Sequence, residues 1–311
     1  MAVPEEFGGS GVADFRYNFI ADEELARVGA SGPGARGRVY PVMVAGMPDC
    51  PYFALPGPWL IAHRGGSGLA PENTLAAFDL AARLGAEALE IDVRRTRDGA
   101  VVVFHDEETT RLTGQTGTIE ARTLEEVGAL DAGFSFSTDG GASSPFRGVG
   151  LEVPTLAELL ARHPRLRLNI DAKTDDEPLA RALAEVLSAA SALHRACVGS
   201  FHDAQAERLG ALLPACARYL PEQAATCHVM AAKSGSNGEG CPGGYDLASL
   251  PHRMGDLVVV DESLVAWFHA RGLPVHVWTV DDPADMRELL RIGVDGIVTD
   301  RPDLLKEVMG R

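Results

Sequence analysis

The chain has 311 residues, of which 46% are hydrophobic, and carries a formal charge of −16 with an isoelectric point near 5.0. This length and apolar content are enough to build one large α/β domain. The sequence contains neither a dense Lys/Arg run nor an apolar stretch of about 18 residues, so we expect no nucleic-acid binding and no stable membrane insertion.

The first 50 residues differ from the rest and are predicted to form a weakly ordered N-terminal extension. They are rich in Gly and Pro, with one short helical pattern around 22–28. Met43 and Met47 stand close before the first clear strand, which makes a later true start an alternative. The extreme N-terminus lacks the basic and apolar segments of a signal peptide. Five cysteines without a CxxC pair are typical of reduced thiols, so we expect a cytoplasmic protein.

From Pro58 onward, predicted strands and helices alternate in a single domain spanning 51–311. The predicted strands are 59–63, 87–93, 166–171, 195–200, 215–220, 257–260, 275–280 and 296–299. Helical patterns lie between most of them, at 74–84, 155–163, 178–191, 203–212, 222–232, 261–271, 284–292 and 302–309. Eight strands interleaved with helices indicate a (β/α)8 TIM barrel rather than an open sheet.

The alternation is interrupted after the second strand, where Asp98-Gly99 is a two-residue turn signal between two extended runs. Such a turn would pair Asp92 with His105 and return His105 to the strand end. Residues 107–154 then form a long insertion with little periodicity, which we expect to cover the site and select the substrate. Residues 233–244 are a second long loop. The sequence does not indicate an oligomeric state.

Carboxylates at two strand ends predict a metal site. Glu90 and Asp92 are two residues apart on one strand and therefore point to the same face. A hard divalent cation, Mg²⁺ or Ca²⁺, fits such all-oxygen ligation. Asp171 stands two residues after Asn169, so it could supply a third ligand, and Lys173 continues the parity as a phosphate-binding cation. The alternatives are a solvated strand end, or ion pairs of these carboxylates with neighbouring basic side chains.

His63 and His105 end buried runs beside these acids, and two histidines can divide general acid and general base duties at phosphorus. Arg64 suits a phosphate oxygen because its planar fork donates two parallel hydrogen bonds. Trp278 could form a wall of the pocket, or could equally be an ordinary barrel core residue. The other histidines lack such neighbours, and His276 is expected in the barrel interior.

Together these residues resemble the glycerophosphodiester phosphodiesterase family. The resemblance rests on HRGG at 63–66, PENT at 71–74, EID at 90–92 and HD at 105–106. The segments VPTLAELL at 153–160, VWTVDD at 277–282 and GVDGIVTDRPDLL at 293–305 extend it over about residues 58–306.

By resemblance, His63 and His105 are the acid/base pair, and Glu90, Asp92 and the acid at 171 bind the metal. The family usually has Glu where this chain has Asp171, whose side chain is one methylene shorter. The metal must therefore shift or take a water there. Arg64 and Lys173 would contact phosphate.

The resemblance implies metal-dependent hydrolysis of a small-molecule glycerophosphodiester to glycerol 3-phosphate and an alcohol. A lysophospholipase D or related lipid phosphodiesterase is one alternative, since Phe134, Phe136 and Phe146 of the insertion could line an acyl groove. A catalytically silent phosphate-binding protein is the other, although the presence of both histidines and all three acids argues against it.

Overall fold

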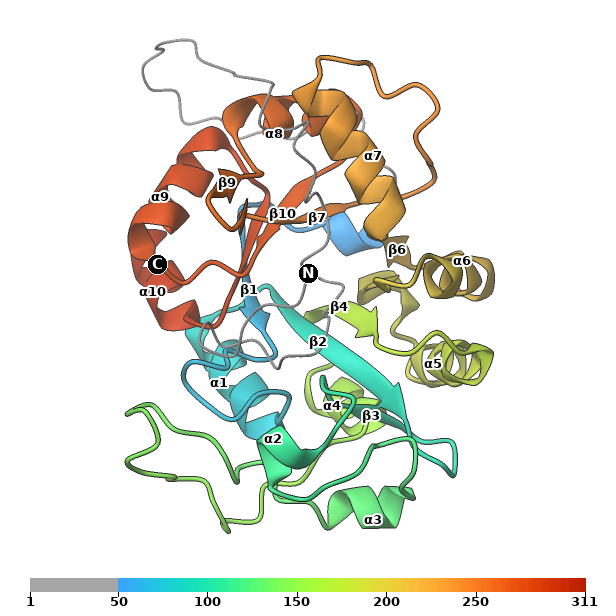
Figure 1. Ribbon diagram of the computed structural model, residues 1–311, viewed down its shortest axis with the longest axis vertical. Coiled ribbons are helices and arrows are strands. Elements are labelled where there is room, and N and C mark those ends of the chain that lie inside the picture. The colour runs from blue at the N-terminus through green and yellow to red at the C-terminus, as the bar shows by residue number, and fades with distance from the viewer. Residues whose placement is uncertain (1–49) are drawn as a thin grey trace.

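Eight parallel strands form a barrel in the computed structural model, which describes residues 50–311, so that the predicted extension, apart from Cys50, lies outside the described residues. Figure 1 shows the strands with helices around them. The strands are β1 (Trp59–His63), β2 (Ala88–Arg95), β4 (Arg167–Ala172), β5 (Ala196–Gly199), β6 (Ala217–Arg218), β7 (Ala248–Pro251), β10 (Val275–Trp278) and β11 (Gly296–Thr299). β11 pairs with β1, and a parallel bridge between Tyr219 and Leu247 joins the β6 and β7 edges, which confirms the predicted TIM barrel.

The helices follow the strands as the periodicity predicts. They are α1 (Leu75–Leu84), α4 (Leu156–Arg162), α5 (Glu177–Ala189), α6 (Asp203–Leu212), α7 (Glu222–Lys233), α8 (Glu262–His269), α9 (Pro283–Ile292) and α10 (Pro302–Val308). The Thr74 hydroxyl accepts a hydrogen bond from the Ala77 amide at the start of α1, and Gly85 ends that helix with a left-handed φ of +91°. Both ends carry ordinary capping chemistry.

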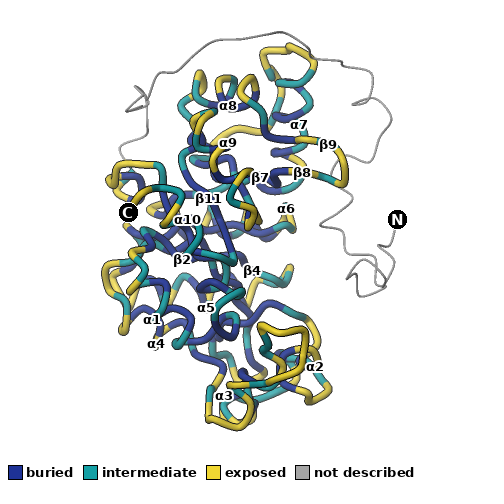
Figure 2. The backbone as a smooth tube through the Cα atoms, turned by 90° about the vertical axis from the view of Figure 1, so that its left-hand side faces the viewer, coloured by how far each residue is buried: buried dark blue, intermediate teal, exposed yellow. Residues whose placement is uncertain are grey.

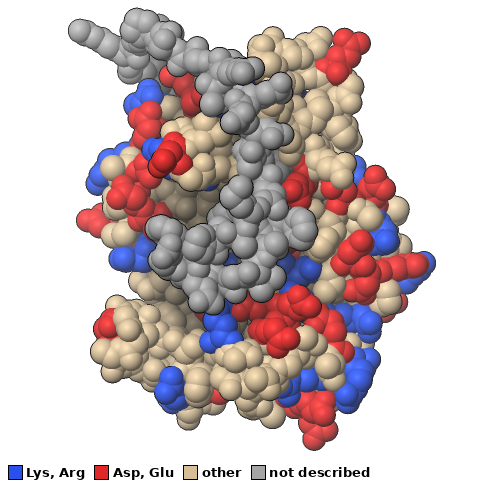
Figure 3. All heavy atoms as spheres, viewed as in Figure 1, with Lys and Arg blue, Asp and Glu red and all other residues tan. Residues whose placement is uncertain are grey.

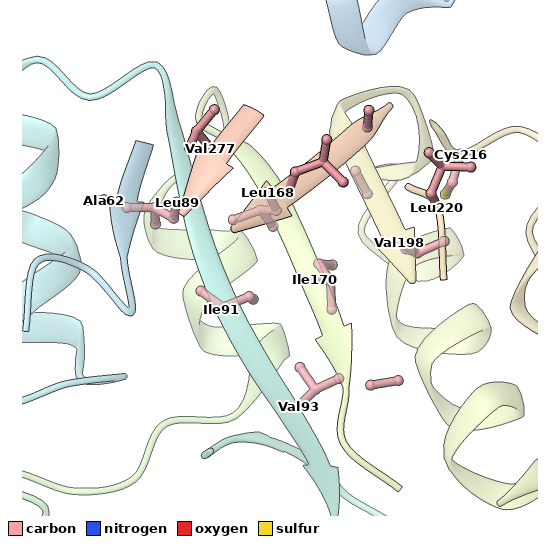
Figure 4. Close-up of a cluster of buried hydrophobic side chains, with 14 of the residues drawn as sticks. Ala62, Leu89, Ile91, Val93, Leu168, Ile170, Val198, Cys216, Leu220 and Val277 are labelled. Carbon is pink, nitrogen blue, oxygen red and sulfur yellow. The ribbon is translucent and has the colours of Figure 1, made fainter. Parts of the chain in front are cut away.

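Strand alternation separates the barrel interior from the layer beneath the helices. Leu89, Ile91 and Val93 of β2 lie in the large apolar cluster under the helices, beside Leu168 and Ile170 of β4 (Figure 4). The intervening residues of both strands point into the barrel. Full burial of one such Leu, Ile or Val side chain contributes about 1.5–3 kcal/mol.

The interior end of the barrel opposite the site is closed by aromatic side chains. The short 3-10 helix η4 (Pro51–Phe53) places Tyr52 against Trp59, with ring centroids 5.3 Å apart. The fully buried Tyr52 hydroxyl donates to the side-chain oxygen of Asn169. His276 is also buried here, 5.4 Å from the Trp59 ring, as predicted.

The prediction that 257–260 is a barrel strand is wrong. The sixth barrel strand is β7, which pairs with β10, whereas β9 (Leu257–Val258) pairs only with β8 (Arg253–Met254) in a small hairpin. Val259 and Val260 are buried just before α8. An apolar run of this length does not distinguish a strand from a buried loop, and Pro251 obscured the true strand.

The insertion 107–154 is an ordered subdomain beside the barrel. It contains α2 (Thr110–Thr113) and α3 (Leu124–Gly128), which lie together at one end of the molecule (Figure 2). A separate apolar cluster unites it with β3 (Val101–Val103), and its buried members are Val102, Phe104, Leu112, Ile119, Val127, Leu130, Ala132 and Val153. Phe136 packs edge-on against Phe146, with ring centroids 5.4 Å apart. This contact between two rings does not by itself form a groove, so the acyl groove stays a prediction.

The expectation that all cysteines are reduced is wrong, because Cys227 and Cys241 form a disulfide. The loop after α7 folds back on that helix and brings the two cysteines together. Their separation of 14 residues in the sequence does not reveal this contact. Disulfides are more typical of oxidising compartments than of the cytosol, so the cytoplasmic location stays a prediction. Cys50, Cys197 and Cys216 are free thiols.

Two surface properties bear on partners. Within residues 50–311, no helix combines the length and apolarity that crossing a bilayer requires. Acidic and basic side chains are interspersed over the described part of the face in Figure 3. The absence of nucleic-acid binding stays a prediction.

Candidate functional site

The predicted site residues meet at the carboxyl-terminal rim of the barrel. In the parallel register, His63 of β1 pairs with Glu90 of β2, and Asp92 of β2 pairs with Asp171 of β4. Carboxyl ends of parallel strands share one edge, which is where TIM-barrel active sites lie. The prediction that Glu90, Asp92 and Asp171 share one face and one edge of the sheet is therefore confirmed. Metal binding by these residues stays a prediction.

His63 is held by the last strand of the barrel. Its Nδ1 lies 2.6 Å from Oδ1 of Asp300, which also accepts a hydrogen bond from the Ser67 hydroxyl, and its Nε2 lies 3.8 Å from Glu90. Burial lowers the pKa of His63, but the charges of Glu90 and Asp300 outweigh it, so the pKa is raised. Sequence reasoning missed Asp300, although an acid directly after a strand end was a usable signal.

Asp92 is surrounded by donors. The Lys173 ammonium lies 2.8 Å from Asp92 and 2.7 Å from Asp171, so it bridges the two carboxylates. Arg64 Nε lies 3.3 Å from the other Asp92 oxygen, and the Asn73 amide donates to that oxygen at 2.9 Å. Although burial opposes it, the charges of Lys173 and its neighbours hold the pKa of Asp92 well below its usual value.

The negative charge of Glu90 is less well compensated by neighbouring donors and cations than that of Asp92. Burial, and then the negative charge of Asp92, raise the pKa of Glu90 to about 7, even though His63 and Arg64 act in the opposite direction. Its nearest donor is the backbone N–H of Arg64, 3.2 Å from Oε2. This carboxylate therefore lies where an added cation would be stabilised.

The carboxylate oxygens of this rim are ligands of the kind that a hard cation prefers, but they are not arranged as a ready-made binding site. Three carboxylates on one rim supply the oxygen ligands that Mg²⁺ and Ca²⁺ prefer. Among the described residues, however, no three acidic, histidine or cysteine side chains are grouped to hold an ion, and Lys173 occupies the space between Asp92 and Asp171. Ligation by all three acids requires the ammonium of Lys173 to move aside.

The predicted hairpin exists, but its register is wrong by one residue. β2 pairs with β3 so that Val93 faces Val103, and the backbone carbonyl of Asp92 accepts from the Phe104 amide, so that Asp92 does not face His105. The turn has three residues, because Thr96 pairs with Ala100 and its hydroxyl donates to Asp98 at 2.6 Å. Three-residue hairpin loops are the next most common class after two-residue loops.

His105 nevertheless reaches the rim. Its Nδ1 lies 2.6 Å from Oδ1 of Asp106, and its backbone carbonyl accepts two hydrogen bonds from Arg94, at 3.1 and 3.0 Å. Burial lowers the pKa of His105 to about 4, with a further lowering from the Lys173 charge, and Asp92 is close enough to oppose this shift. His63 and His105 thus carry opposite pKa shifts, and each has Nδ1 bound by an aspartate.

Aromatic side chains line the site beside Lys173. Trp278, at the end of β10, packs edge-on against Phe201, with centroids 5.9 Å apart, and the Lys173 ammonium lies 5.9 Å from the Phe201 ring. The Tyr219 hydroxyl donates to Asp171 at 3.0 Å. Phe201 and Tyr219 were missed, because neither belongs to a recognisable motif. Contact of Trp278 with substrate stays a prediction.

Two further groups connect the rim to the insertion. Glu72 accepts from Arg64 Nη1 at 2.7 Å and from Arg111 at 2.8 and 2.9 Å. Arg111 also binds both carboxylate oxygens of Asp106, at 2.5 and 3.0 Å. A hollow of about 760 Å³ lies elsewhere, near His194 and Cys216.

Comparisons with known proteins agree on one family. The model of the glycerophosphoryl diester phosphodiesterase family matches residues 63–304. A probable glycerophosphodiester phosphodiesterase 2 from Mycobacterium tuberculosis is 33% identical over 270 residues, which cover 85% of this chain and 95% of the relative.

Solved structures share the fold. The glycerophosphoryl diester phosphodiesterase domain of an uncharacterised Mycobacterium tuberculosis protein matches with a TM-score of 0.73 at 23% identity, covering 82% of this chain and 99% of that domain. An Oleispira antarctica phosphodiesterase, solved in complex with its product sn-glycerol-3-phosphate, matches with a TM-score of 0.65 at 26% identity. That match covers 82% of this chain and 97% of the other.

Proposed function

The chain belongs to the glycerophosphoryl diester phosphodiesterase family, and we propose that it hydrolyses its substrate with the help of a divalent metal ion and a pair of histidines. As a glycerophosphodiester phosphodiesterase, it hydrolyses glycerophosphodiesters, and we propose glycerol 3-phosphate and an alcohol as the products. The observation that carries the mechanism is the pair His63 and His105 on one rim, each bound through Nδ1 by its own aspartate.

The two aspartates define what the histidines can do. A carboxylate at Nδ1 favours the tautomer with hydrogen on that nitrogen and directs Nε2 towards the reacting groups. One histidine then takes a proton from the attacking water, or from a substrate hydroxyl whose cyclic product water later opens, as the new P–O bond forms. The other gives a proton to the leaving alkoxide as the old P–O bond breaks. The raised pKa of His63 and the lowered pKa of His105 favour His63 as donor and His105 as acceptor.

The acids of the rim would hold the metal ion, and its basic side chains would hold the phosphate. Glu90, Asp92 and Asp171 would bind Mg²⁺ or Ca²⁺, which supplies charge neutralisation at the phosphoryl oxygens when bound. Arg64 and Lys173 supply positive charge at the same rim, where they would contact the phosphate once the Lys173 ammonium has moved away from Asp92 and Asp171. The surplus negative charge around Glu90 supports the metal.

Phosphate-ester release from a panel of water-soluble glycerophosphodiesters and lysolipids tests the proposal. We expect turnover of the water-soluble esters, its loss in excess chelator, and its return with Mg²⁺ or Ca²⁺. Full activity in chelator after dialysis would contradict the proposed metal dependence. Preference for lysolipids would favour the lysophospholipase D alternative, and absence of turnover on every ester would favour a silent binding protein.

The histidine roles need a second experiment. General acid–base catalysis contributes about 10²–10⁴-fold per group, so His63→Ala and His105→Ala should each lower kcat by about that factor. Exposed His194, on the far side of the fold near the 760 Å³ hollow, provides the matched control His194→Ala. A glycerophosphodiester of p-nitrophenol needs no proton on leaving, so it should rescue His63→Ala alone. Near wild-type kcat in either variant on a natural diester would contradict the pair.

A further inference from the structure

We propose that Arg111, contributed by the insertion, is a positioning residue that holds His105 and Arg64 in one fixed array. This inference rests on the proposed function and adds to it a residue outside the motifs that carry the chemistry. The hydrogen bonds of Arg111 go to two carboxylates, Asp106 and Glu72, and it acts through them.

The guanidinium of Arg111 binds both carboxylates in bidentate fashion. Nε donates to Asp106 Oδ2 at 2.5 Å and Nη2 to Asp106 Oδ1 at 3.0 Å. Nη1 donates to Glu72 Oε2 at 2.8 Å and Nη2 to Glu72 Oε1 at 2.9 Å. Four hydrogen bonds from one planar fork fix both carboxylates relative to each other, which a lysine could not do.

Each carboxylate passes that orientation to a site residue. Asp106 Oδ1 lies 2.6 Å from His105 Nδ1, and Glu72 Oε1 accepts from Arg64 Nη1 at 2.7 Å. The result is one continuous chain from His105 through Asp106, Arg111 and Glu72 to Arg64. It therefore couples the predicted proton-transfer group to the predicted phosphate-binding group.

This series of hydrogen-bonded side chains also balances charge. The Glu72 and Asp106 side chains are only 11% and 20% exposed, whereas Arg111 is 50% exposed. Removing Arg111 leaves two neighbouring carboxylates, largely removed from water, with one less positive charge between them. Such a loss is more disruptive than breaking an exposed ion pair, because the partners cannot simply be solvated.

The fold of the insertion holds the helix that carries Arg111. Arg111 lies on α2, whose neighbour Leu112 is buried in the insertion's own apolar cluster. The Thr109 hydroxyl before α2 donates to the Gly117 carbonyl at 3.0 Å, which holds the start of the helix. The insertion thus supplies a brace for two side chains of the site, and its predicted role in covering the site stays a prediction.

Steady-state kinetics of Arg111→Ala and Arg111→Lys on a glycerophosphodiester test this role. Misplacement of a catalytic group by about 1 Å costs about 10²-fold, so we expect kcat to fall by about that factor in Arg111→Ala and by about 10-fold in Arg111→Lys. Millimolar guanidinium should restore most of the lost kcat of Arg111→Ala, whereas equal methylammonium should not, because it lacks the planar fork. His105→Ala should not respond to guanidinium.

Arg162 supplies the matched control. It makes a bidentate pair with Asp79 at 2.7 and 2.6 Å, is 53% exposed, and lies on α4 outside the site. Arg162→Ala should keep wild-type kcat and be insensitive to guanidinium.

Three outcomes would overturn the inference. Arg111→Ala with at least half of wild-type kcat, or with a lost activity that guanidinium does not restore and a melting temperature well below that of Arg162→Ala, would refute the positioning role alone. No turnover by the wild type on any glycerophosphodiester would overturn the proposed function, and this role with it.

Discussion

Replacing Asp300 by Asn should slow catalysis by removing the partner of His63. The two side chains lie 2.6 Å apart, with exposed fractions of 28% and 18%, so their hydrogen bond is charge-assisted and only partly accessible to water. Hydrogen bonds to charged groups contribute about 1.5–3 kcal/mol. At about 1.4 kcal/mol per factor of ten, we expect kcat to fall by about 10- to 100-fold.

The same substitution should change the pH dependence in a defined direction. The negative charge of Asp300 stabilises protonated His63 and contributes to its raised pKa, together with Glu90 and against burial. Without that charge, the pKa of His63 falls. The limb of the pH–rate profile that His63 controls should therefore move to lower pH in Asp300→Asn.

Asp295 and His269 offer a control pair of the same kind away from the rim. Their side chains lie 2.7 Å apart and are similarly buried, so Asp295→Asn removes a comparable carboxylate. Its kcat and pH profile should match the wild type. If Asp300→Asn retained kcat within twofold of the wild type with an unmoved pH limb, Asp300 would not position His63.

Three other perturbations test separate parts of the molecule. Asp171→Ala should weaken metal binding in a titration of the metal against the protein, and Asp171→Glu should keep activity; unchanged metal affinity in the alanine variant would exclude Asp171 as a ligand. Replacing Cys227 and Cys241 by Ser should lower the free energy of unfolding by about 3 kcal/mol in urea, because the disulfide spans 14 residues; an unchanged midpoint would show that the crosslink adds nothing. A chain beginning at Met47 should fold and turn over substrate normally, and a large fall in its melting temperature would show that residues 1–46 pack on the domain.

Local sequence pattern was enough to predict the barrel and its rim. Apolar runs of strand length alternating with helical periodicity indicated eight strands, and the two-residue spacing of Glu90 and Asp92 placed both side chains inside. These inferences succeeded because strand parity is a property of the backbone and does not depend on which strands are neighbours.

Inferences that needed a specific partner failed more often. The hairpin register shifted by one residue because the Thr96 hydroxyl bonds within the turn and produces a three-residue loop. The sixth strand was misplaced because 257–260 and β7 are both short apolar runs, and only pairing with β10 separates them. The disulfide depends on a loop that folds back on α7.

The sequence by itself determined which chemical groups stand at the carboxyl ends of the strands. Only the tertiary structure decided how they are paired: Asp300 with His63, Lys173 between Asp92 and Asp171, and Arg111 between Asp106 and Glu72. The reason is that hydrogen bonds and ion pairs depend on distances of a few tenths of an ångström between segments far apart in the chain. No local pattern carries that information, because it arises when the barrel closes and the insertion folds against it.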